Sequence, residues 1–114
     1  MFKREEKTVG LPHNAFAVGT TIEGNICADE DIRIDGTMTG NIICSGKVVI
    51  GPQATVTGNI EAVTADIMGR IVGNVSIKEI LTIRSTGVIE GDIITQQLAV
   101  EPDAKFSGRC SMAQ

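Results

Sequence analysis

The chain has 114 residues and a mass of 12.0 kDa, which limits it to one domain with short tails. Tryptophan and tyrosine are absent and phenylalanine occurs three times, so the core must consist of small aliphatic side chains. Thirteen glycines, with isoleucine and valine spread from end to end, favour many short strands and argue against a helical bundle.

The net charge of -4 and the lack of any cluster of basic and aromatic residues argue against nucleic-acid binding. No apolar run is long enough to span a bilayer, and the charged N-terminus lacks the apolar stretch of a signal peptide. We therefore expect a cytoplasmic protein. Cys27, Cys44 and Cys110 are odd in number and have no short paired spacing, so we expect reduced thiols rather than disulfides or a zinc site.

A five-residue motif, apolar-x-Gly-Asn-apolar, recurs along the chain. It occupies residues 22–26, 38–42, 56–60, 71–75 and 89–93, with a weaker sixth copy at 106–110. The glycines of successive copies lie 16, 18, 15, 18 and 17 residues apart, which gives a repeat of about 17 residues. A fixed period of this length is typical of a solenoid.

Two further apolar columns accompany the motif. Before it we align the pairs Phe16 with Val18, Ile32 with Ile34, Val48 with Ile50, Ala65 with Ile67, Leu81 with Ile83, and Leu98 with Val100. After it a third column contains Ala28, Cys44, Ala62, Ile77, Thr95 and Met112.

Three short alternating segments in each repeat predict three strands around a triangular coil. The predicted fold is therefore all-β: a single-domain parallel β-helix of about six rungs of 16–17 residues. We place this domain at residues 16–112, between a flexible N-terminal tail at 1–15 and a C-terminal stub at 113–114.

The glycine and asparagine of the motif are expected at one corner of the coil. Glycine allows the positive φ or close backbone approach that a tight corner requires, and stacked asparagine amides can form a hydrogen-bonded ladder. The predicted corner ladder consists of Gly24, Asn25, Gly40, Asn41, Gly58, Asn59, Gly73, Asn74, Gly91 and Gly108.

The motif columns, the Asp-Ile-Arg-Ile-Asp-Gly run at 31–36 and the segment 49–60 together resemble the bactofilins, a family of bacterial cytoskeletal proteins. The resemblance covers about residues 16–112. It implies a right-handed coil that polymerises end to end, without nucleotide or other cofactor, into non-polar filaments. It also implies association with the membrane and roles in cell shape or in localising client proteins, such as cell-wall or morphogenesis factors.

A stacked coil exposes a strand edge and a layer of apolar side chains at each end, and monomeric solenoids cover these ends with caps. Residues 1–15 read as a charged tail and only Ala113 and Gln114 follow the last column, so we expect both ends to be open and to join other copies of the chain. Phe106 is the largest inward side chain of the last rung. The predicted polymerisation interface consists of Phe16, Val18, Ile22, Val100, Phe106, Cys110 and Met112.

The first residues are similar to the short membrane-targeting start of some bactofilins. We expect contact with the inner face of the cytoplasmic membrane through Met1, Phe2, Lys3 and Arg4.

The alternative is an enzyme, because residues 50–56 also resemble the hexapeptide repeat of left-handed β-helix acyltransferases and carbonic anhydrases. Those enzymes need histidine as a base or metal ligand, and the sole histidine is His13. Stacked threonines suggest ice binding, but they stack in only two rungs. The acidic group at 29–35 suggests calcium binding, but its spacing matches neither the calcium-binding β-roll nonapeptide nor an EF-hand loop, and it occurs in one rung only. We predict no catalytic, cofactor or metal site.

Overall fold

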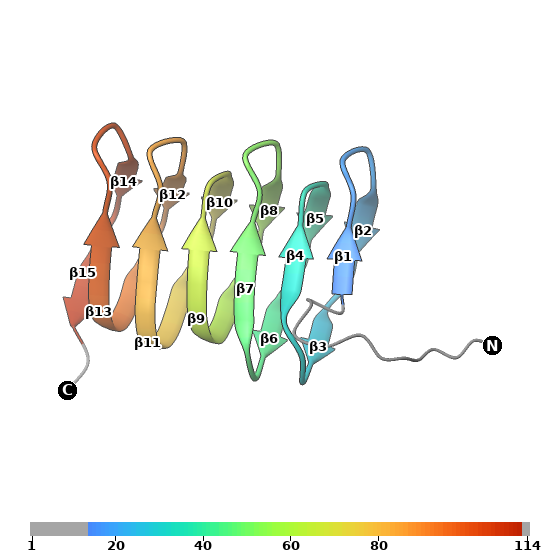
Figure 1. The fold of residues 1–114 in the computed structure, drawn as a ribbon, viewed down its shortest axis with the longest axis horizontal. Coiled ribbons are helices and arrows are strands. Elements are labelled where there is room, and N and C mark those ends of the chain that lie inside the picture. Colours follow the sequence, from blue (N-terminus) through green and yellow to red (C-terminus); the bar gives the residue numbers. More distant parts are fainter. Residues whose placement is uncertain (1–13, 113–114) are drawn as a thin grey trace.

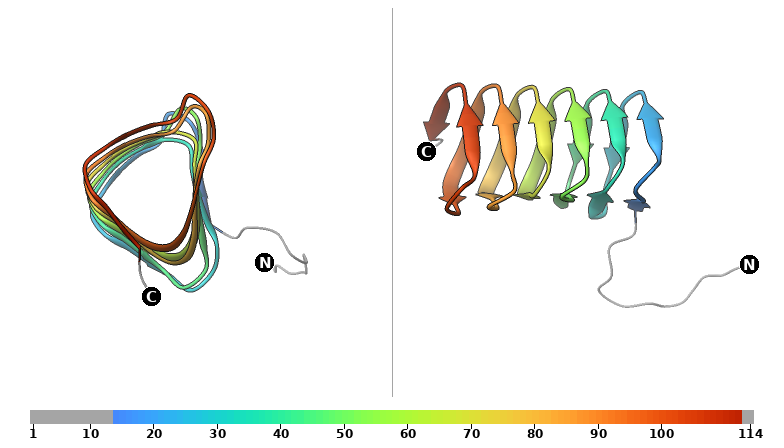
Figure 2. Two further views of the ribbon diagram at one scale, coloured as in Figure 1. Left: turned by 90° about the vertical axis from the view of Figure 1, so that its left-hand side faces the viewer. Right: turned by 90° about the horizontal axis from the view of Figure 1, so that it is seen from above.

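The computed structural model describes residues 14–112, which form 15 strands and no helix. The strands wind into a coil of six rungs (Figure 1). The strands of the near face run upward, the chain crosses the top to the far side, and each turn is displaced toward the C-terminal end, which makes the coil right-handed. The predicted right-handed parallel β-helix is confirmed, and the end-on view in Figure 2 shows its triangular outline.

The coil has three faces, and we name each after its first strand. The β1 face contains β1 (Asn14–Phe16), β4 (Ile32–Ile34), β7 (Lys47–Ile50) and the C-terminal parts of β9 (Ile60–Ile67), β11 (Val75–Ile83) and β13 (Ile93–Val100). The β2 face contains β2 (Thr21–Glu23), β5 (Thr37–Thr39), β8 (Thr55–Thr57), β10 (Arg70–Val72), β12 (Val88–Glu90) and β14 (Lys105–Ser107). The β3 face contains β3 (Ile26–Ala28), β6 (Ile42–Cys44), the N-terminal parts of β9, β11 and β13, and β15 (Cys110–Met112).

Every strand pairing is parallel and joins one rung to the next. In β9, β11 and β13 one continuous strand turns the corner from the β3 face to the β1 face, and the register shifts there, between Ile77 and Ile80 in β11. The first two rungs have separate strands at this corner, with short connections at 29–31 and 45–46.

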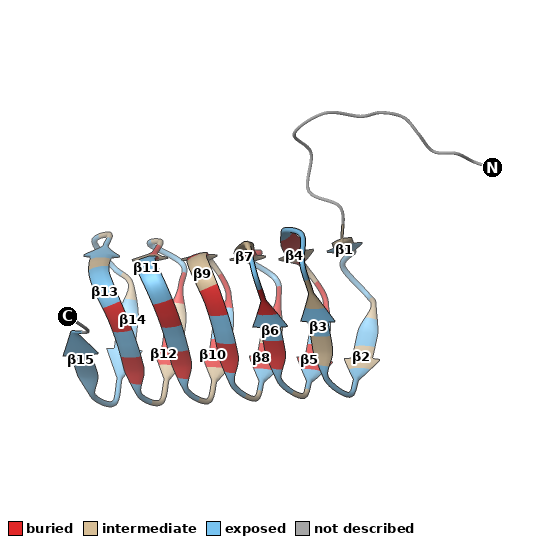
Figure 3. Ribbon diagram, turned by 90° about the horizontal axis from the view of Figure 1, so that it is seen from below, coloured by how far each residue is buried: buried red, intermediate tan, exposed pale blue. Residues whose placement is uncertain are grey.

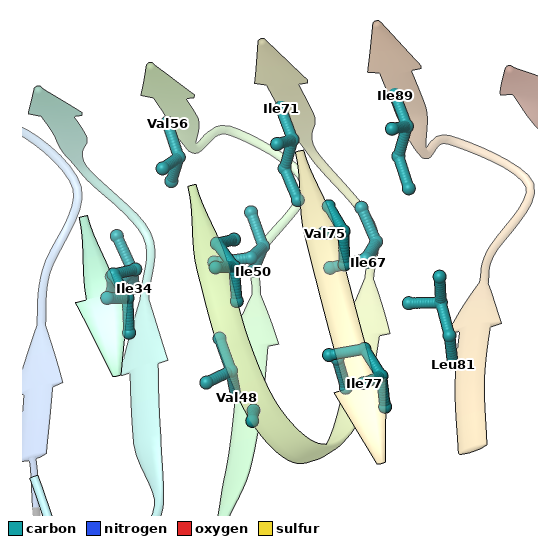
Figure 4. Packing of buried hydrophobic residues seen from close by; sticks show 14 of the residues in the cluster. Ile34, Val48, Ile50, Val56, Ile67, Ile71, Val75, Ile77, Leu81 and Ile89 are labelled. Carbon is teal, nitrogen blue, oxygen red and sulfur yellow. The ribbon is translucent and has the colours of Figure 1, made fainter. Parts of the chain in front are cut away.

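The core fills the inside of the coil with one apolar layer per rung (Figure 4). Ile34, Ile50, Ile67 and Ile83 stack in one column and are fully buried, as the alternating pattern predicts. Branched aliphatic side chains suit this role because they fill a flat layer between two strands with few rotamers.

Each glycine of the repeated motif turns the chain from the β2 face to the β3 face with positive φ, from +124° at Gly24 to +146° at Gly73 and Gly91. The asparagine that follows uses its side chain differently from the predicted ladder of amides. The Oδ1 of Asn41 accepts a hydrogen bond from the backbone N–H of Asn59 at 2.9 Å. The side chain therefore satisfies a corner N–H of the next rung, which the strand ladder leaves open.

One predicted alignment is wrong. In the register of β1 with β4, Phe16 lies beside Ile34 and Asn14 beside Ile32, so the first pair of the column is Asn14 and Phe16 rather than Phe16 and Val18. Val18 lies in the turn after β1 and is 61% exposed. This turn is of the longer type, closed by a hydrogen bond from Thr20 N to Ala17 O, and a uniform spacing of 16–17 residues shifted the alignment by two positions.

Candidate polymerisation interface

The N-terminal end layer consists of the inward side chains of β1, β2 and β3. These strands pair only with β4, β5 and β6, so within residues 14–112 their outer edges have no partner strand. The layer contains Phe16, Ile22, Ile26 and Ala28, which are partly buried because they pack on the core layer of the second rung.

The C-terminal end layer belongs to the last part of β13 and to β14 and β15. Its side chains are those of Leu98, Val100, Phe106, Cys110 and Met112. Val100, Phe106 and Met112 are 53%, 36% and 52% exposed. No strand of the described residues covers the outer edges of these three segments either.

The exposure of this layer results from its position in the coil. One rung earlier, Ile83, Ile89 and Thr95 occupy the same columns as Val100, Phe106 and Met112 and are fully buried. A further rung stacked on the C-terminal end would bury Val100, Phe106 and Met112 in the same way and would pair the open strand edges.

The structure places six of the seven predicted interface residues in the end layers: Phe16, Ile22, Val100, Phe106, Cys110 and Met112. Val18 does not belong to an end layer because it lies in the turn between β1 and β2. The end layers also contain Ile26, Ala28 and Leu98, which the interface predicted from the sequence omitted. Each of them stood in an apolar column of the sequence, so including the outermost member of every column would have added them.

The asparagine ladder has a direction and a defined last acceptor. Asn25, Asn41, Asn59, Asn74 and then Asp92 each accept a hydrogen bond from the backbone N–H one rung further on. The final donor is the N–H of Arg109, which stands in the ladder position of the sixth rung. Because a guanidinium has no acceptor, the ladder ends at the C-terminal rung.

Ion pairs on the β1 face connect the C-terminal rung to the rungs before it. Lys47, Asp66, Arg84 and Glu101 form a chain across four rungs, with N···O distances of 3.2, 3.4 and 2.9 Å. The hydrogen bond from Arg84 lowers the pKa of Glu101 below its ordinary value of 4.5. Glu101 also accepts from the backbone N–H of Ser85, so it ties the turn after β13 to the turn before β12.

No group of three or more metal-binding side chains occurs among residues 14–112. Nor does this part of the chain contain a helix that is long and apolar enough to cross a membrane. The predicted membrane contacts Met1, Phe2, Lys3 and Arg4 lie outside the described residues, so nothing here tests them.

Comparison with known proteins gives consistent results. A family model described as "Bactofilin: Polymer-forming cytoskeletal" matches residues 14–111. Bactofilin BacO of Myxococcus xanthus (strain DK1622) is 26% identical over 108 residues, which are 95% of this chain and 86% of BacO. Bactofilin BacP of the same organism is 29% identical over 91 residues, which are 80% of this chain and 38% of BacP.

Among solved structures, the chain is similar to a cryo-EM reconstruction of Thermus thermophilus bactofilin double helical filaments. The TM-score is 0.84 at 25% sequence identity, and the match covers 89% of this chain and 100% of that chain. Bactofilins are cytoskeletal polymers rather than enzymes, so the alternative of a hexapeptide-type enzyme is not supported. The chain belongs to the bactofilin family of polymer-forming cytoskeletal proteins.

Proposed function

We propose that this chain polymerises through its two end layers, without nucleotide, and that the resulting filament scaffolds client proteins at the inner face of the cytoplasmic membrane. The observation that carries the proposal is the pair of open ends, each with apolar side chains and strand edges that no described residue covers. Such an end behaves as an interrupted core and an interrupted sheet at the same time.

The energy of a joint permits assembly without a bound cofactor. Burial of four or five apolar side chains contributes on the order of 6 to 15 kcal/mol, at about 1.5 to 3 kcal/mol each. Loss of translational and rotational freedom opposes this by about 4 to 15 kcal/mol. Hydrogen bonds between the strand edges add directionality, because they form only when the two ends meet in register.

The direction of the asparagine ladder supports joints between like ends. In a head-to-tail joint, the backbone N–H of Asn25 would meet the side chain of Arg109, which is a donor and cannot accept it. Joints of N-terminal with N-terminal ends, and of C-terminal with C-terminal ends, do not bring Asn25 and Arg109 together. We therefore propose non-polar filaments.

The variant Phe106→Arg tests the end joint. It should leave the coil folded, because Phe106 lies in the last layer, and should abolish filaments, because a charge would enter the joint without a partner. Negative-stain electron microscopy of purified protein, with circular dichroism to verify the fold, gives the answer.

Ser107→Arg is the matched control. Ser107 is the next residue of β14, is exposed, and points to the opposite side of the strand. The Ser107→Arg variant should polymerise as the wild type does. Filaments of normal length from Phe106→Arg would remove the C-terminal layer from the joint.

The membrane part of the proposal depends on the first four residues, Met1 to Arg4. Burial of Met1 and Phe2 in a bilayer contributes only about 2 to 4 kcal/mol. In a filament the segment recurs on every subunit, so many weak contacts act together. Client proteins, such as cell-wall or morphogenesis factors, would gain from the same repetition, because each subunit offers an identical site.

Deletion of residues 1–7 tests the membrane contact. The shortened protein should still form filaments but should no longer co-sediment with liposomes made of anionic and zwitterionic lipids. The single variant Phe2→Ser serves as the milder control and should reduce co-sedimentation without changing filament length. Equal co-sedimentation of wild type and deletion would show that residues 1–7 make no contact with the lipid.

A further inference from the structure

The outer surface of the β3 face carries a column of exposed side chains that the end joint does not use. In rung order the column reads Cys27, Ile43, Glu61, Ser76, Ile94 and Ser111, and the strand register places each beside the next. Figure 3 views this side of the coil, where β6, β9 and β11 each show an exposed residue between two buried ones. We call this column the lateral column.

The lateral column contains the two most exposed large apolar side chains of the four interior rungs. Ile43 and Ile94 are each 50% exposed although they lie in strands with outward neighbours on both sides. Glu61 is the one charged residue of the column. The other two faces carry more charge: Arg33 and Asp66 on the β1 face, and Glu23, Arg70, Glu90 and Lys105 on the β2 face.

The order of residues in the column is nearly symmetric about its centre. Ile43 lies in the second rung and Ile94 in the fifth, so both are one rung from an end. Glu61 and Ser76 occupy the two middle rungs, and the small residues Cys27 and Ser111 occupy the two end rungs. A surface with this symmetry can pair with a second copy of itself by a two-fold rotation.

Two different two-fold rotations bring an isoleucine of one copy against an isoleucine of the other: one leaves the two coils parallel and the other makes them antiparallel. The charges that meet in each arrangement show which is favoured. With the two coils parallel, Glu61 faces the Glu61 of the other copy, which is a like-charge contact. With the coils antiparallel, Glu61 faces Ser76 of the other copy. Lys78 points to the same side of β11 as Ser76, two residues further on, so it then lies within reach of Glu61.

Neither Glu61 nor Lys78 forms an ion pair with another described residue, so both are free to form this contact. We propose that the β3 face joins two filaments side by side. Each coil lies antiparallel to the coil that it faces in the other filament, so that Ile43 of one copy packs on Ile94 of the other and Glu61 pairs with Lys78.

One pair of faces is too small to hold two monomers together. Six rungs at about 4.8 Å, and a width of about 10 Å, give roughly 300 Å² per copy. Stable interfaces bury about 800 Å² per partner. The contact becomes effective only when end joints have aligned many faces along a filament, since the separate contacts then act together. This inference therefore depends on the proposed end joint, and also agrees with the double helical filaments of the Thermus thermophilus relative.

The variants Ile43→Glu and Ile94→Glu test the face. Each should still polymerise but should give single filaments instead of pairs, as measured by filament width in electron microscopy. Thr57→Glu is the matched control: Thr57 is exposed and points outward from β8 on the β2 face, and the variant should keep paired filaments. Paired filaments in Ile43→Glu and Ile94→Glu would overturn the proposal, as would loss of pairing in Thr57→Glu alone.

The end joint and the lateral contact fail in different ways. Phe106→Arg removes all filaments if the end joint is as proposed, whereas the lateral variants change only their width. Should Ile94→Glu abolish polymerisation, the milder variant Ile94→Ser is examined; if it too gives no filaments, the separation of the two contacts is wrong.

Cross-linking tests the orientation. In a background of Cys27→Ser and Cys110→Val, a tagged Ile43→Cys protein is co-polymerised with an untagged Ile94→Cys protein and treated with a short bismaleimide. Cys44 remains because it is buried. Antiparallel coils should give cross-links between the two proteins. Cross-links only between two copies of the same variant would mean parallel coils and would overturn the proposed orientation.

Discussion

The glycine at the corner between the β2 and β3 faces is required for two separate reasons. Gly58 has a φ of +144°, which L side chains rarely adopt. In addition, a Cβ at Gly58 would overlap the backbone carbonyl of Gly40 in the preceding rung. Gly24 also has a positive φ, but a Cβ there would meet nothing within 4 Å, because no rung precedes it in the described coil. The two positions therefore separate backbone strain from steric overlap.

We predict that Gly58→Ala destabilises the coil much more than Gly24→Ala. Both substitutions carry the strain of a positive φ, about 1 to 3 kcal/mol. Gly58→Ala adds overlap with backbone atoms that cannot move aside, which costs about 1 to 3 kcal/mol more. The melting temperature should therefore fall by about 10 °C more for Gly58→Ala. Thermal unfolding of protein diluted below the concentration at which the joints form measures monomers, and equal losses would contradict the overlap.

The sequence predicted the glycine corner but not the direction of the asparagine ladder. Residue type and spacing show that Asn41 and Asn59 stack, since the period is regular. They do not show whether an amide bonds to another amide or to backbone, because that depends on where the corner N–H points. The structure shows that the side chain of each rung accepts from the backbone N–H of the next rung, so Arg109, whose side chain cannot accept, ends the ladder.

At the scale of strands, the alternating pattern predicted the columns in the interior rungs, and the error fell where a turn changed length. From Phe16 to Ile22 the chain takes the longer turn, as it does from Ile50 to Val56. The sequence around Val18 offers a second apolar residue at the position that a 16-residue spacing requires, so two alignments fit equally well. The pairing of β1 with β4 decides between them, and no local signal could.

The lateral column shows a second limit at this scale. Ile43 and Ile94 follow inward residues directly in the sequence, so each reads as part of a longer apolar segment. Only the strand register shows that they point outward and that they lie symmetrically about the middle of the coil. Outward apolar residues therefore went unnoticed, whereas the inward end layers were found.

We predict that the three thiols differ in reactivity and that polymerisation changes only some of them. Burial raises the pKa of the Cys44 thiol, so it holds little thiolate at neutral pH and should react only after unfolding. Cys110 is exposed in the C-terminal end layer, where an end joint would cover it. Iodoacetamide labelling of Cys110 should slow by roughly tenfold or more in filaments.

Wild-type protein diluted below the concentration at which filaments form provides the reference for this labelling. Mass spectrometry of the digested protein distinguishes the three sites. Rapid labelling of Cys110 inside intact filaments would exclude it from the joint, and rapid labelling of Cys44 in the folded monomer would contradict its burial in the second rung.

At the scale of the whole molecule, the end rungs are the weak points of the isolated coil. Each interior layer is covered on both sides, whereas Phe16 and Phe106 lie in layers with one open side. Stability of a solenoid is approximately a sum over rungs and the interfaces between them, so the proposed joints at the two ends would supply the interfaces that the monomer lacks. Folding and polymerisation should therefore be thermodynamically coupled.

This coupling predicts a melting temperature that rises with protein concentration. Filament formation stabilises the folded state by mass action, and each tenfold increase in concentration above the assembly threshold adds about 1.4 kcal/mol. For a domain of this size that corresponds to a rise of about 5 °C or more. Phe106→Arg keeps only the joint between N-terminal ends, so its melting temperature should rise less with concentration, while Ser107→Arg should follow the wild type. A wild-type melting temperature that is independent of concentration across the assembly threshold would mean that the joint buries too little of the end layers to stabilise them, and that the filament is held together by some other surface of the coil.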